Sequence, residues 1–211
     1  MKSLKIKVCG MRENQNILDL AALKPDFMGF IFYNKSPRNV LIFKNSKEIL
    51  NLPKTIKKTG VFVDETFENI LEYVSEFNLD FVQLHGSESP DFCQKIKSKG
   101  IGVIKAFGID KTFSFKQTVK YEKSVDFFLF DTKGKEHGGN GFKFDWSILK
   151  NYNQKIPFLL AGGIAIENIE DLIELKELNI SGLDVNSKFE IIPGLKDISN
   201  LKLLFQKIRS I

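Results

Sequence analysis

Short apolar runs alternate with longer amphipathic segments along the whole chain. The run at 158–161 is apolar without a break, which is typical of a parallel strand covered on both faces. The segment at 67–77 carries Ile70, Leu71 and Val74 at helical spacing and predicts a helix with one buried face. The same patterns predict strands at 4–9, 27–33, 58–63, 80–85, 101–107, 126–131, 158–161 and 181–185. They predict helices at 14–23, 44–50, 67–77, 90–99, 113–121, 144–150, 166–176 and 198–208.

Eight strand–helix pairs in alternation predict parallel strands joined by right-handed crossovers. Eight such strands close into a barrel, so we predict an α/β protein with a (β/α)8 (TIM) barrel, a single domain over residues 1–211. The alternative is a doubly wound open sheet, which is disfavoured because the G-x-G-x-x-G fingerprint is missing after the first strand. In a barrel the ligand site lies at the carboxyl ends of the strands.

Strand alternation indicates which side chains point into the barrel. In the first strand Ile6 and Val8 form the apolar face that packs against helices, so Lys7 and Cys9 face inward. The same reasoning assigns the inward side chains of three further strands, which are Gln83 and His85 in the fourth, Lys105 and Phe107 in the fifth, and Asp131 with Phe127 and Leu129 in the sixth. We therefore expect a thiol, an amide, an imidazole, a carboxylate and lysines to converge at one end of the barrel.

A di-glycine follows the seventh strand and precedes the next helix. Gly162 and Gly163 have no side chains, so backbone N–H groups can approach a ligand there, and the helix points its positive dipole end toward it. Phosphate is the natural ligand for such a turn, and an ordinary tight turn is the alternative. The segment at 181–188, S-G-L-D-V-N-S-K, favours the phosphate site because it is a second short strand that ends in small, hydrogen-bonding residues.

Composition and charge narrow the function classes. The 211 residues are 43% hydrophobic, which suffices for one sizeable core. The net charge of +5 and the pI near 9.0 would suit a polyanion, but the lysines are spread evenly, so we expect no nucleic-acid partner. No apolar run approaches the ~18 residues of a membrane span, and the first residues are too short in their apolar part for a signal peptide. We expect a cytoplasmic protein with no membrane partner.

The two cysteines are expected to be free thiols, because cytosolic conditions keep thiols reduced. Cys93 lies in a predicted helix beside Phe92 and is interpreted as a core residue, whereas the strand-end position of Cys9 favours a functional thiol. No Cys or His pair has the spacing of metal ligands. The G-G-N-G sequence at 138–141 lacks the Lys-Ser/Thr ending of a nucleotide loop.

Eight short motifs are spread from the first strand to the last helix. They are K-V-C-G-M at 7–11, F-Y-N-K-S-P-R at 32–38, G-V-F-V-D at 60–64, V-Q-L-H-G at 82–86, I-K-A-F at 104–107, L-A-G-G-I at 160–164, G-L-D-V-N-S at 182–187 and P-G-L-K-D at 193–197. In this order they resemble the phosphoribosylanthranilate isomerase family. The resemblance implies an enzyme of tryptophan biosynthesis, without metal or organic cofactor, that rearranges N-(5-phosphoribosyl)anthranilate to 1-(2-carboxyphenylamino)-1-deoxyribulose 5-phosphate.

The resemblance also implies roles for single residues. Cys9 would be the general base and Asp131 the general acid, and Arg38 would contact the anthranilate carboxylate, a task that suits its planar guanidinium. The residues that fall where the family holds the phosphate are Gly162, Gly163, Asp184, Asn186 and Ser187. Gln83 and His85 would line the pocket. The implied partner is the small phosphosugar–anthranilate substrate, and we expect a monomer or a homodimer.

Two segments depart from the family pattern or extend it. Lys188 stands where the family usually has a small residue, and the loop at 132–143 resembles one that the family orders over its substrate, so we expect a mobile lid.

Two other functions stay open. One is another phosphosugar barrel enzyme such as an indole-glycerol-phosphate synthase, disfavoured by the lack of a helical extension before residue 4. The other is a non-catalytic basic module that binds anions.

Lys7 has two interpretations. It lies two residues before Cys9 on the same face, so its charge, at a distance of about 7 Å, would favour the thiolate by roughly 2 kcal/mol. Burial of the thiol opposes that effect. Lys7 would otherwise pair with an interior carboxylate and only fill the lower barrel.

Overall fold

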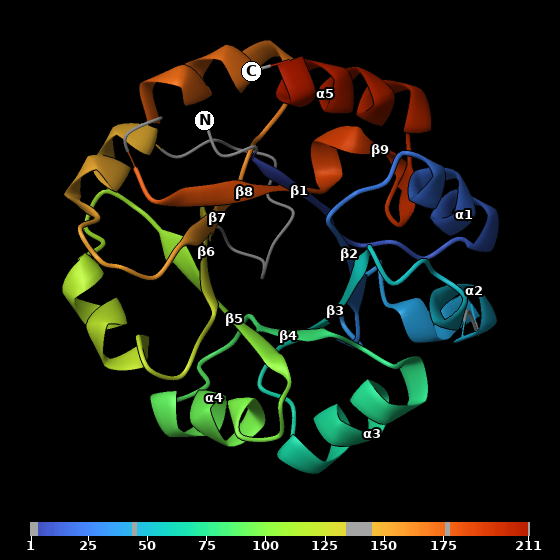
Figure 1. The fold of residues 1–211 in the computed structure, drawn as a ribbon, viewed down its shortest axis with the longest axis horizontal. Helices are drawn as coiled ribbons and strands as arrows, with labels where there is room; N and C mark the ends of the chain where they lie inside the picture. The colour runs from blue at the N-terminus through green and yellow to red at the C-terminus, as the bar shows by residue number, and fades with distance from the viewer. Residues whose placement is uncertain (1–3, 44–45, 134–144, 176–177, 211) are drawn as a thin grey trace.

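Eight parallel strands pair in sequence order, and the pairing of β8 with β1 closes them into a barrel. The computed structural model describes residues 4–43, 46–133, 145–175 and 178–210. The strands are β1 (Lys5–Val8), β2 (Phe27–Ile31), β3 (Lys57–Phe62), β4 (Phe81–Leu84), β5 (Gly102–Ile109), β6 (Phe127–Thr132), β7 (Phe158–Leu160) and β8 (Ile180–Val185). Helices surround the strands as an outer ring (Figure 1). The predicted (β/α)8 barrel is confirmed, and the open-sheet alternative is wrong because both edges pair.

The segments after the first four strands and after β8 are α-helices. They are α1 (Asn14–Ala22), α2 (Ser46–Leu50), α3 (Phe67–Phe77), α4 (Pro90–Lys97) and α5 (Ile198–Ser210). Local sequence sets two of their starts. Thr66 and Ser89 accept hydrogen bonds from the N–H groups of Asn69 and Phe92, both at 3.2 Å, and so cap α3 and α4. Pro90 occupies the first turn of α4, where its missing N–H breaks no helical hydrogen bond.

The segments after β5, β6 and β7 are 3₁₀ helices, which the sequence pattern did not predict. They are η2 (Phe115–Tyr121), η3 (Trp146–Asn151) and η4 (Ile166–Leu175), and shorter turns of the same kind form η1 (Val40–Phe43) and η5 (Ser187–Phe189). In η2 the β-branched Thr118 and Val119 and the aromatic Tyr121 have low α-helix propensity. A two-stranded antiparallel sheet of β9 (Glu190–Ile192) and β10 (Leu195–Lys196) after η5 was also not predicted.

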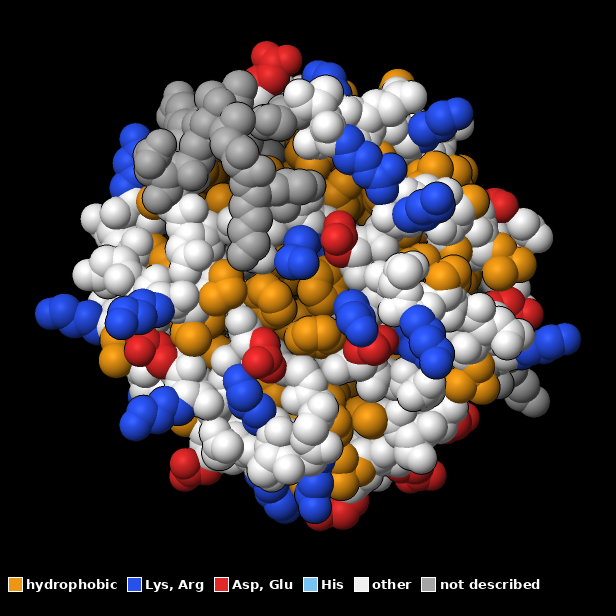
Figure 2. All heavy atoms as spheres, viewed as in Figure 1, with side chains coloured by type: hydrophobic (Ala, Val, Ile, Leu, Met, Phe, Trp, Pro, Cys, Tyr) orange, Lys and Arg blue, Asp and Glu red, His pale blue; other side chains and the backbone are white. Residues whose placement is uncertain are grey.

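Two apolar layers fill the molecule. The larger lies between strands and helices and includes Ile6, Val8, Val82 and Leu84, as alternation predicted. The smaller lies inside the barrel and consists of Ile104, Ala106, Leu129, Leu159 and Ala161, with Phe81 and Phe127 packed against it. Viewed end-on, hydrophobic side chains fill the centre of the face and acidic and basic side chains surround them (Figure 2). The barrel is therefore a packed core and not a pore.

The predicted orientation of the fifth strand is wrong. Ile104 and Ala106 face the barrel interior, so Lys105 and Phe107 point outward to the helices. Phe107 packs edge-on against Tyr121 at 5.4 Å between ring centroids. Lys105 Nζ pairs with Glu88 Oε2 at 3.1 Å and donates to the carbonyls of Leu84, Gly86 and Ala106. The prediction failed because both faces of this strand carry apolar residues, so alternation does not show which face is inward. The position of Lys105 is set by its partner carboxylate, which lies outside the barrel.

None of the helices in the described part of the chain has the length and hydrophobicity of a membrane span. Residues 134–144, which hold most of the predicted lid and its G-G-N-G sequence, lie outside the described residues.

Candidate active site

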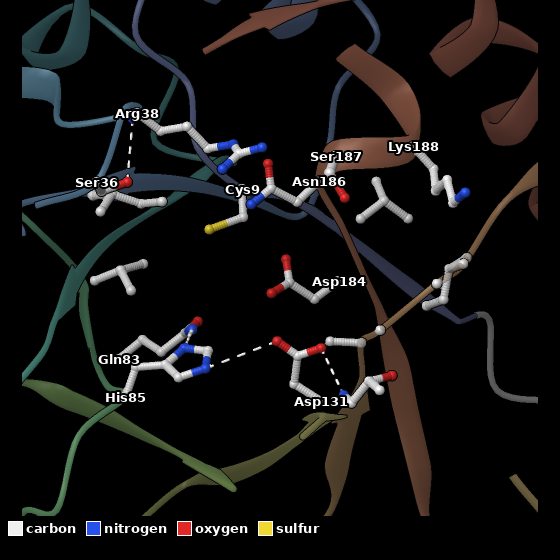
Figure 3. Close-up of a pocket in the computed structure, with 18 of the residues that line it drawn as sticks. Cys9, Ser36, Arg38, Gln83, His85, Asp131, Asp184, Asn186, Ser187 and Lys188 are labelled. Carbon is white, nitrogen blue, oxygen red and sulfur yellow. Dashed lines mark hydrogen bonds and ion pairs between the residues drawn. The ribbon is translucent and has the colours of Figure 1, made fainter. Parts of the chain in front are cut away.

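A single pocket at the carboxyl ends of the strands is lined by all the residues predicted for catalysis and substrate binding, whereas Lys105, expected to face the same end of the barrel, points outward. Its volume is about 800 Å³, open mouth included. The predicted residues that line it are Cys9, Arg38, Gln83, His85, Asp131, Gly162, Gly163, Asp184, Asn186 and Ser187, together with Lys188 (Figure 3). The sequence predicted that the turn after β7 and the segment after β8 form two parts of one phosphate site. Both line this pocket.

Cys9 follows β1 and is held at the pocket by its own backbone. Its N–H donates to Val185 O at 2.9 Å, and the residue is only 4% exposed. Gly29 on the neighbouring strand leaves room for the sulfur, because a Cβ there would lie 2.8 Å from Cys9 Sγ. The free thiol thus lines the pocket while water is largely excluded from it.

Lys7 pairs with Asp184 in the interior below Cys9. Its Nζ lies 2.9 and 3.0 Å from the two carboxylate oxygens, and its side chain is fully buried. Burial lowers the pKa of Lys7, but the charges and hydrogen bonds of Asp184 and Cys9 together outweigh it, so the pKa lies above its ordinary value. The interior salt bridge that the sequence left as one of two interpretations is therefore present.

Burial raises the pKa of the Cys9 thiol, and the effect of Lys7 is too small to reverse this. The Lys7 charge and its hydrogen bond to the thiol lower the pKa, as the other interpretation held, but the Asp184 carboxylate raises it again. Lys7 thus acts on the thiol in the direction that this interpretation gave, but desolvation is the largest effect and the pKa stays raised. Without substrate the thiol form predominates at neutral pH.

Asp131 lies near the end of β6 in an environment that favours its protonated form. Burial and the nearby Asp184 charge raise its pKa to about 6, although the Thr132 N–H donates to Oδ1 at 2.8 Å and Lys7 also opposes the shift. His85 Nε2 lies 3.8 Å from Asp131 Oδ2, and His85 Nδ1 lies 2.9 Å from Gln83 Nε2. With the Gln83 amide donating to Nδ1, the proton of a neutral His85 resides on Nε2 and faces Asp131.

The di-glycine turn has the backbone shape that requires glycine. Gly162 and Gly163 have φ of +84° and +66°, and a Cβ on Gly162 would lie 2.3 Å from Thr132 Oγ1. Asn168 fixes the turn, since its Nδ2 donates to Gly163 O at 2.8 Å and its Oδ1 accepts from Ala165 N at 3.0 Å. Within the described residues neither glycine N–H has a protein acceptor. These N–H groups are therefore available to an anion.

Two charged residues at the site were missed from the sequence. Glu190 pairs with Arg38 at 2.7 Å, and Lys196 pairs with Glu190 at 2.6 Å. Asn186, assigned to the phosphate, uses its Oδ1 to accept from Lys196 Nζ. The only signal for this group was the P-G turn that separates a glutamate from a lysine at 190–196. Within the described residues no group of three or more His, Cys, Asp or Glu side chains could hold a metal ion.

The family model described as "PRAI: N-(5'phosphoribosyl)anthranilate (PRA) isomerase" matches residues 6–207. The chain belongs to this family. It is 47% identical to the N-(5'-phosphoribosyl)anthranilate isomerase of Parabacteroides distasonis, over 96% of this chain and 92% of that protein. It is 44% identical to the isomerase of Phocaeicola vulgatus, over 91% of each chain.

Solved isomerase structures share the fold. The enzyme from Thermotoga maritima superposes with a TM-score of 0.85 at 30% identity, covering 99% of this chain and 100% of that one. An isomerase in complex with reduced 1-(o-carboxyphenylamino)-1-deoxyribulose 5-phosphate has a TM-score of 0.82 at 29% identity, with coverage of 99% and 100%. The predicted isomerase activity and its place in tryptophan biosynthesis are thus confirmed. The synthase and the non-catalytic anion-binding module are both wrong.

Proposed function

We propose that the pocket binds N-(5'-phosphoribosyl)anthranilate and that Cys9 and Asp131 isomerise it as general base and general acid. The observation that carries this proposal is their position in one pocket, on strands well separated around the barrel, with a carboxyl whose pKa of about 6 suits an acid. A sugar bound between β1 and β6 would present its ring oxygen to one group and its C2 hydrogen to the other.

Asp131 protonates the ribose ring oxygen. With a pKa of about 6, roughly a tenth of the molecules carry the proton at pH 7, far more than for an ordinary carboxyl. The C1–O bond breaks as the oxygen takes the proton, and the nitrogen lone pair forms a C=N bond, which gives an open-chain iminium. Its positive charge then acidifies the hydrogen on C2.

Cys9 removes the C2 proton as thiolate, and the electron pair of the C–H bond neutralises the iminium to give an enolamine. Movement of the C2 hydroxyl proton to C1 completes the rearrangement to the ketone. The raised pKa of the free thiol makes the thiolate scarce but strongly basic. Lys7 and the iminium itself, both cationic, favour the thiolate at the moment when it is needed.

The remaining pocket residues hold the two anionic ends of the substrate. Gly162, Gly163 and Ser187 bind the phosphate, with Lys188 beside them as an added cation. Arg38 binds the anthranilate carboxylate. Asp184 lies near these groups, but its carboxylate would repel a phosphate. We therefore assign it the role of raising the pKa values of Cys9 and Asp131.

Further features of the proposal concern the chain as a whole. We place one domain over residues 1–211 and a cytoplasmic location. A Thermotoga maritima relative is described as dimeric, which supports a homodimer here as one of the two states proposed, the other being a monomer.

Complementation tests the proposal in a living cell. We expect the chain to restore growth of a tryptophan auxotroph that lacks this isomerase, and we expect Cys9→Ala and Asp131→Asn to fail although both proteins accumulate and fold. Growth supported by either variant would show that the acid or the base lies elsewhere.

A further inference from the structure

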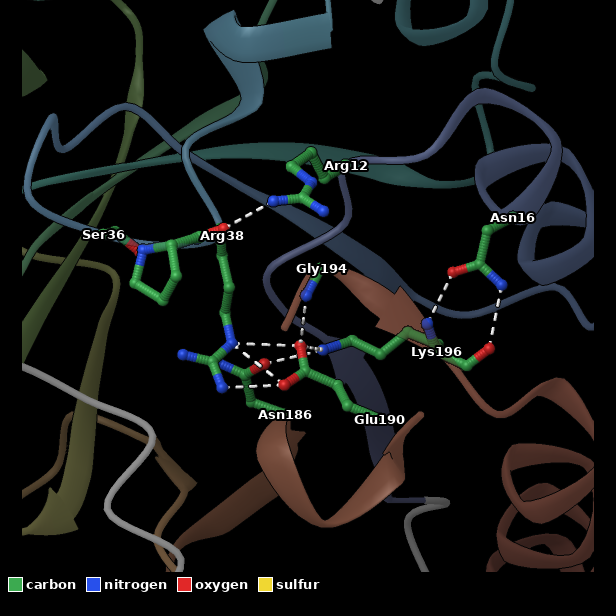
Figure 4. Close-up of polar contacts among 9 residues, drawn as sticks. Arg12, Asn16, Ser36, Arg38, Asn186, Glu190, Gly194 and Lys196 are labelled. Atoms are coloured by element: carbon green, nitrogen blue, oxygen red, sulfur yellow. Dashed lines mark hydrogen bonds and ion pairs between the residues drawn. The ribbon is translucent and has the colours of Figure 1, made fainter. Parts of the chain in front are cut away.

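The hairpin after β8 carries the P-G-L-K-D segment, to which the proposed mechanism assigns no role. In its antiparallel pairing Glu190 lies opposite Lys196. Gly194 in the turn has φ of +88°, and a Cβ there would lie 2.8 Å from Arg12 Nε, so glycine is required. The hairpin thereby presents Glu190 and Lys196 together to Arg38 (Figure 4).

Glu190 binds one edge of the Arg38 guanidinium. Arg38 Nε donates to the two carboxylate oxygens at 3.0 and 3.1 Å, and Nη2 donates to Oε2 at 2.7 Å. The side chains are only 4% and 13% exposed, so the contact is shielded from water. Within the described residues Nη1 has no acceptor, and Arg38 lines the substrate pocket. The second edge of the guanidinium is therefore left for a ligand.

Lys196 balances the charge of Glu190. Its Nζ donates to Glu190 Oε1 and to Asn186 Oδ1, both at 2.6 Å, and its side chain is fully buried. Asn16 anchors the same residue through the main chain, accepting from Lys196 N at 2.7 Å and donating to Lys196 O at 2.9 Å. Glu190 alone would neutralise Arg38. Two cations around one carboxylate leave a net charge of +1, which matches a single carboxylate on a ligand.

The protonation states agree with this charge. Burial raises the pKa of Glu190, but hydrogen bonds from Arg38 and Lys196 outweigh it and hold the pKa below its usual range. Burial lowers the pKa of Lys196 to about 8, against the opposing effect of Glu190, so this lysine is still mostly protonated at pH 7.

We propose that Glu190 and Lys196 are positioning residues that make Arg38 selective for the aryl carboxylate of the substrate. Glu190 fixes the plane of the guanidinium with Nη1 toward the pocket, and Lys196 preserves the positive charge that a carboxylate needs. The inference rests on the proposed binding of the carboxylate by Arg38. If the pair only anchored the hairpin, its loss would weaken all ligands alike.

Selectivity between two ligands gives the test. One is reduced 1-(o-carboxyphenylamino)-1-deoxyribulose 5-phosphate, and the other is its counterpart made from aniline, which lacks the carboxylate. Calorimetric titration at pH 7 is expected to show that the wild type prefers the first by about 10-fold or more, since a charge-assisted contact is at stake. Glu190→Gln and Lys196→Met are each expected to lose most of this preference and to bind the aniline compound within about threefold of wild type.

Asp126→Asn is the matched control, because it breaks an ion pair with Lys97 that lies outside the pocket, and it is expected to keep the preference. Arg38→Ala separates the carboxylate role of Arg38 from the positioning role of Glu190 and Lys196. If Arg38→Ala keeps the preference, the carboxylate role of Arg38 is wrong. If it loses the preference while Glu190→Gln and Lys196→Met keep it, only the positioning role is overturned. Thermal unfolding shows whether each variant is folded. If either Glu190→Gln or Lys196→Met does not fold, the remaining one alone decides whether the positioning role holds.

Discussion

Replacing Asp131 by asparagine should stabilise the protein while it abolishes turnover. Burial and Asp184 raise the pKa of Asp131 from 3.8 to about 6, a shift of roughly two units. At 1.36 kcal/mol per unit, keeping this carboxylate ionised costs the native state about 3 kcal/mol. Asparagine carries no charge and its Oδ1 can still accept from Thr132 N, so the variant escapes that cost.

The pH dependence of the effect has a definite sign. The native pKa lies above the unfolded value, so the cost is fully present above pH 6 and disappears as the pH falls toward 3.8. We expect Asp131→Asn to unfold several degrees higher than wild type at pH 8, because about 2–4 °C per kcal/mol is usual at this size. The two melting temperatures should converge as the pH approaches 4. Turnover should fall by roughly 10²–10⁴-fold, since an amide has no proton to donate to the ring oxygen.

Calorimetric melting at pH 8, 6 and 4, with activity measured on the same samples, checks this prediction. Asp19→Asn is the control, because it neutralises an exposed carboxylate that also accepts a hydrogen bond, from Gln15. A variant no more stable than wild type at pH 8, or one whose advantage does not change with pH, would refute the reasoning that the surroundings of Asp131 raise its pKa.

Two further predictions concern buried ion pairs. Lys7→Met should raise the pH midpoint for alkylation of Cys9 by iodoacetamide, because Lys7 lowers the thiol pKa. Asp184→Asn should lower the midpoint, because Asp184 raises that pKa. Shifts in the same direction in the two folded variants would contradict this. Lys105→Met should lower the free energy of unfolding by about 3–5 kcal/mol in urea titrations, because Glu88 is left buried and unpaired, and a loss below about 1 kcal/mol would argue against that pairing.

The sequence was most informative where one face of a strand is apolar and the other is not. In β1 and β4 the apolar residues identified the helix-facing side, so the inward positions of Cys9 and Gln83 followed from a period of two. The strand ends then placed the site residues at one end of the barrel, because parallel strands share that end. Asp131 was placed correctly by the same rule, although both faces of β6 are apolar.

Contacts between distant segments limited what else could be predicted. Lys105 faces outward because its partner Glu88 lies 17 positions earlier, in a loop whose path the pattern does not reveal. The β9–β10 hairpin is too short for a periodic signal, so Glu190 and Lys196 were not linked to Arg38, more than 150 positions earlier in the chain. Both errors concern charged groups, whose positions depend on partners and not on periodicity.

The most direct test of the central claim is the single-turnover rate of Cys9→Ala and Asp131→Asn at saturating substrate, measured with the affinity of each for the reduced product analogue. If these residues are the base and the acid, each rate falls by about 10²-fold or more while the affinity stays within about threefold of wild type. A folded variant of either kind that turns over within tenfold of the wild-type rate would contradict the assignment of acid and base to this pair.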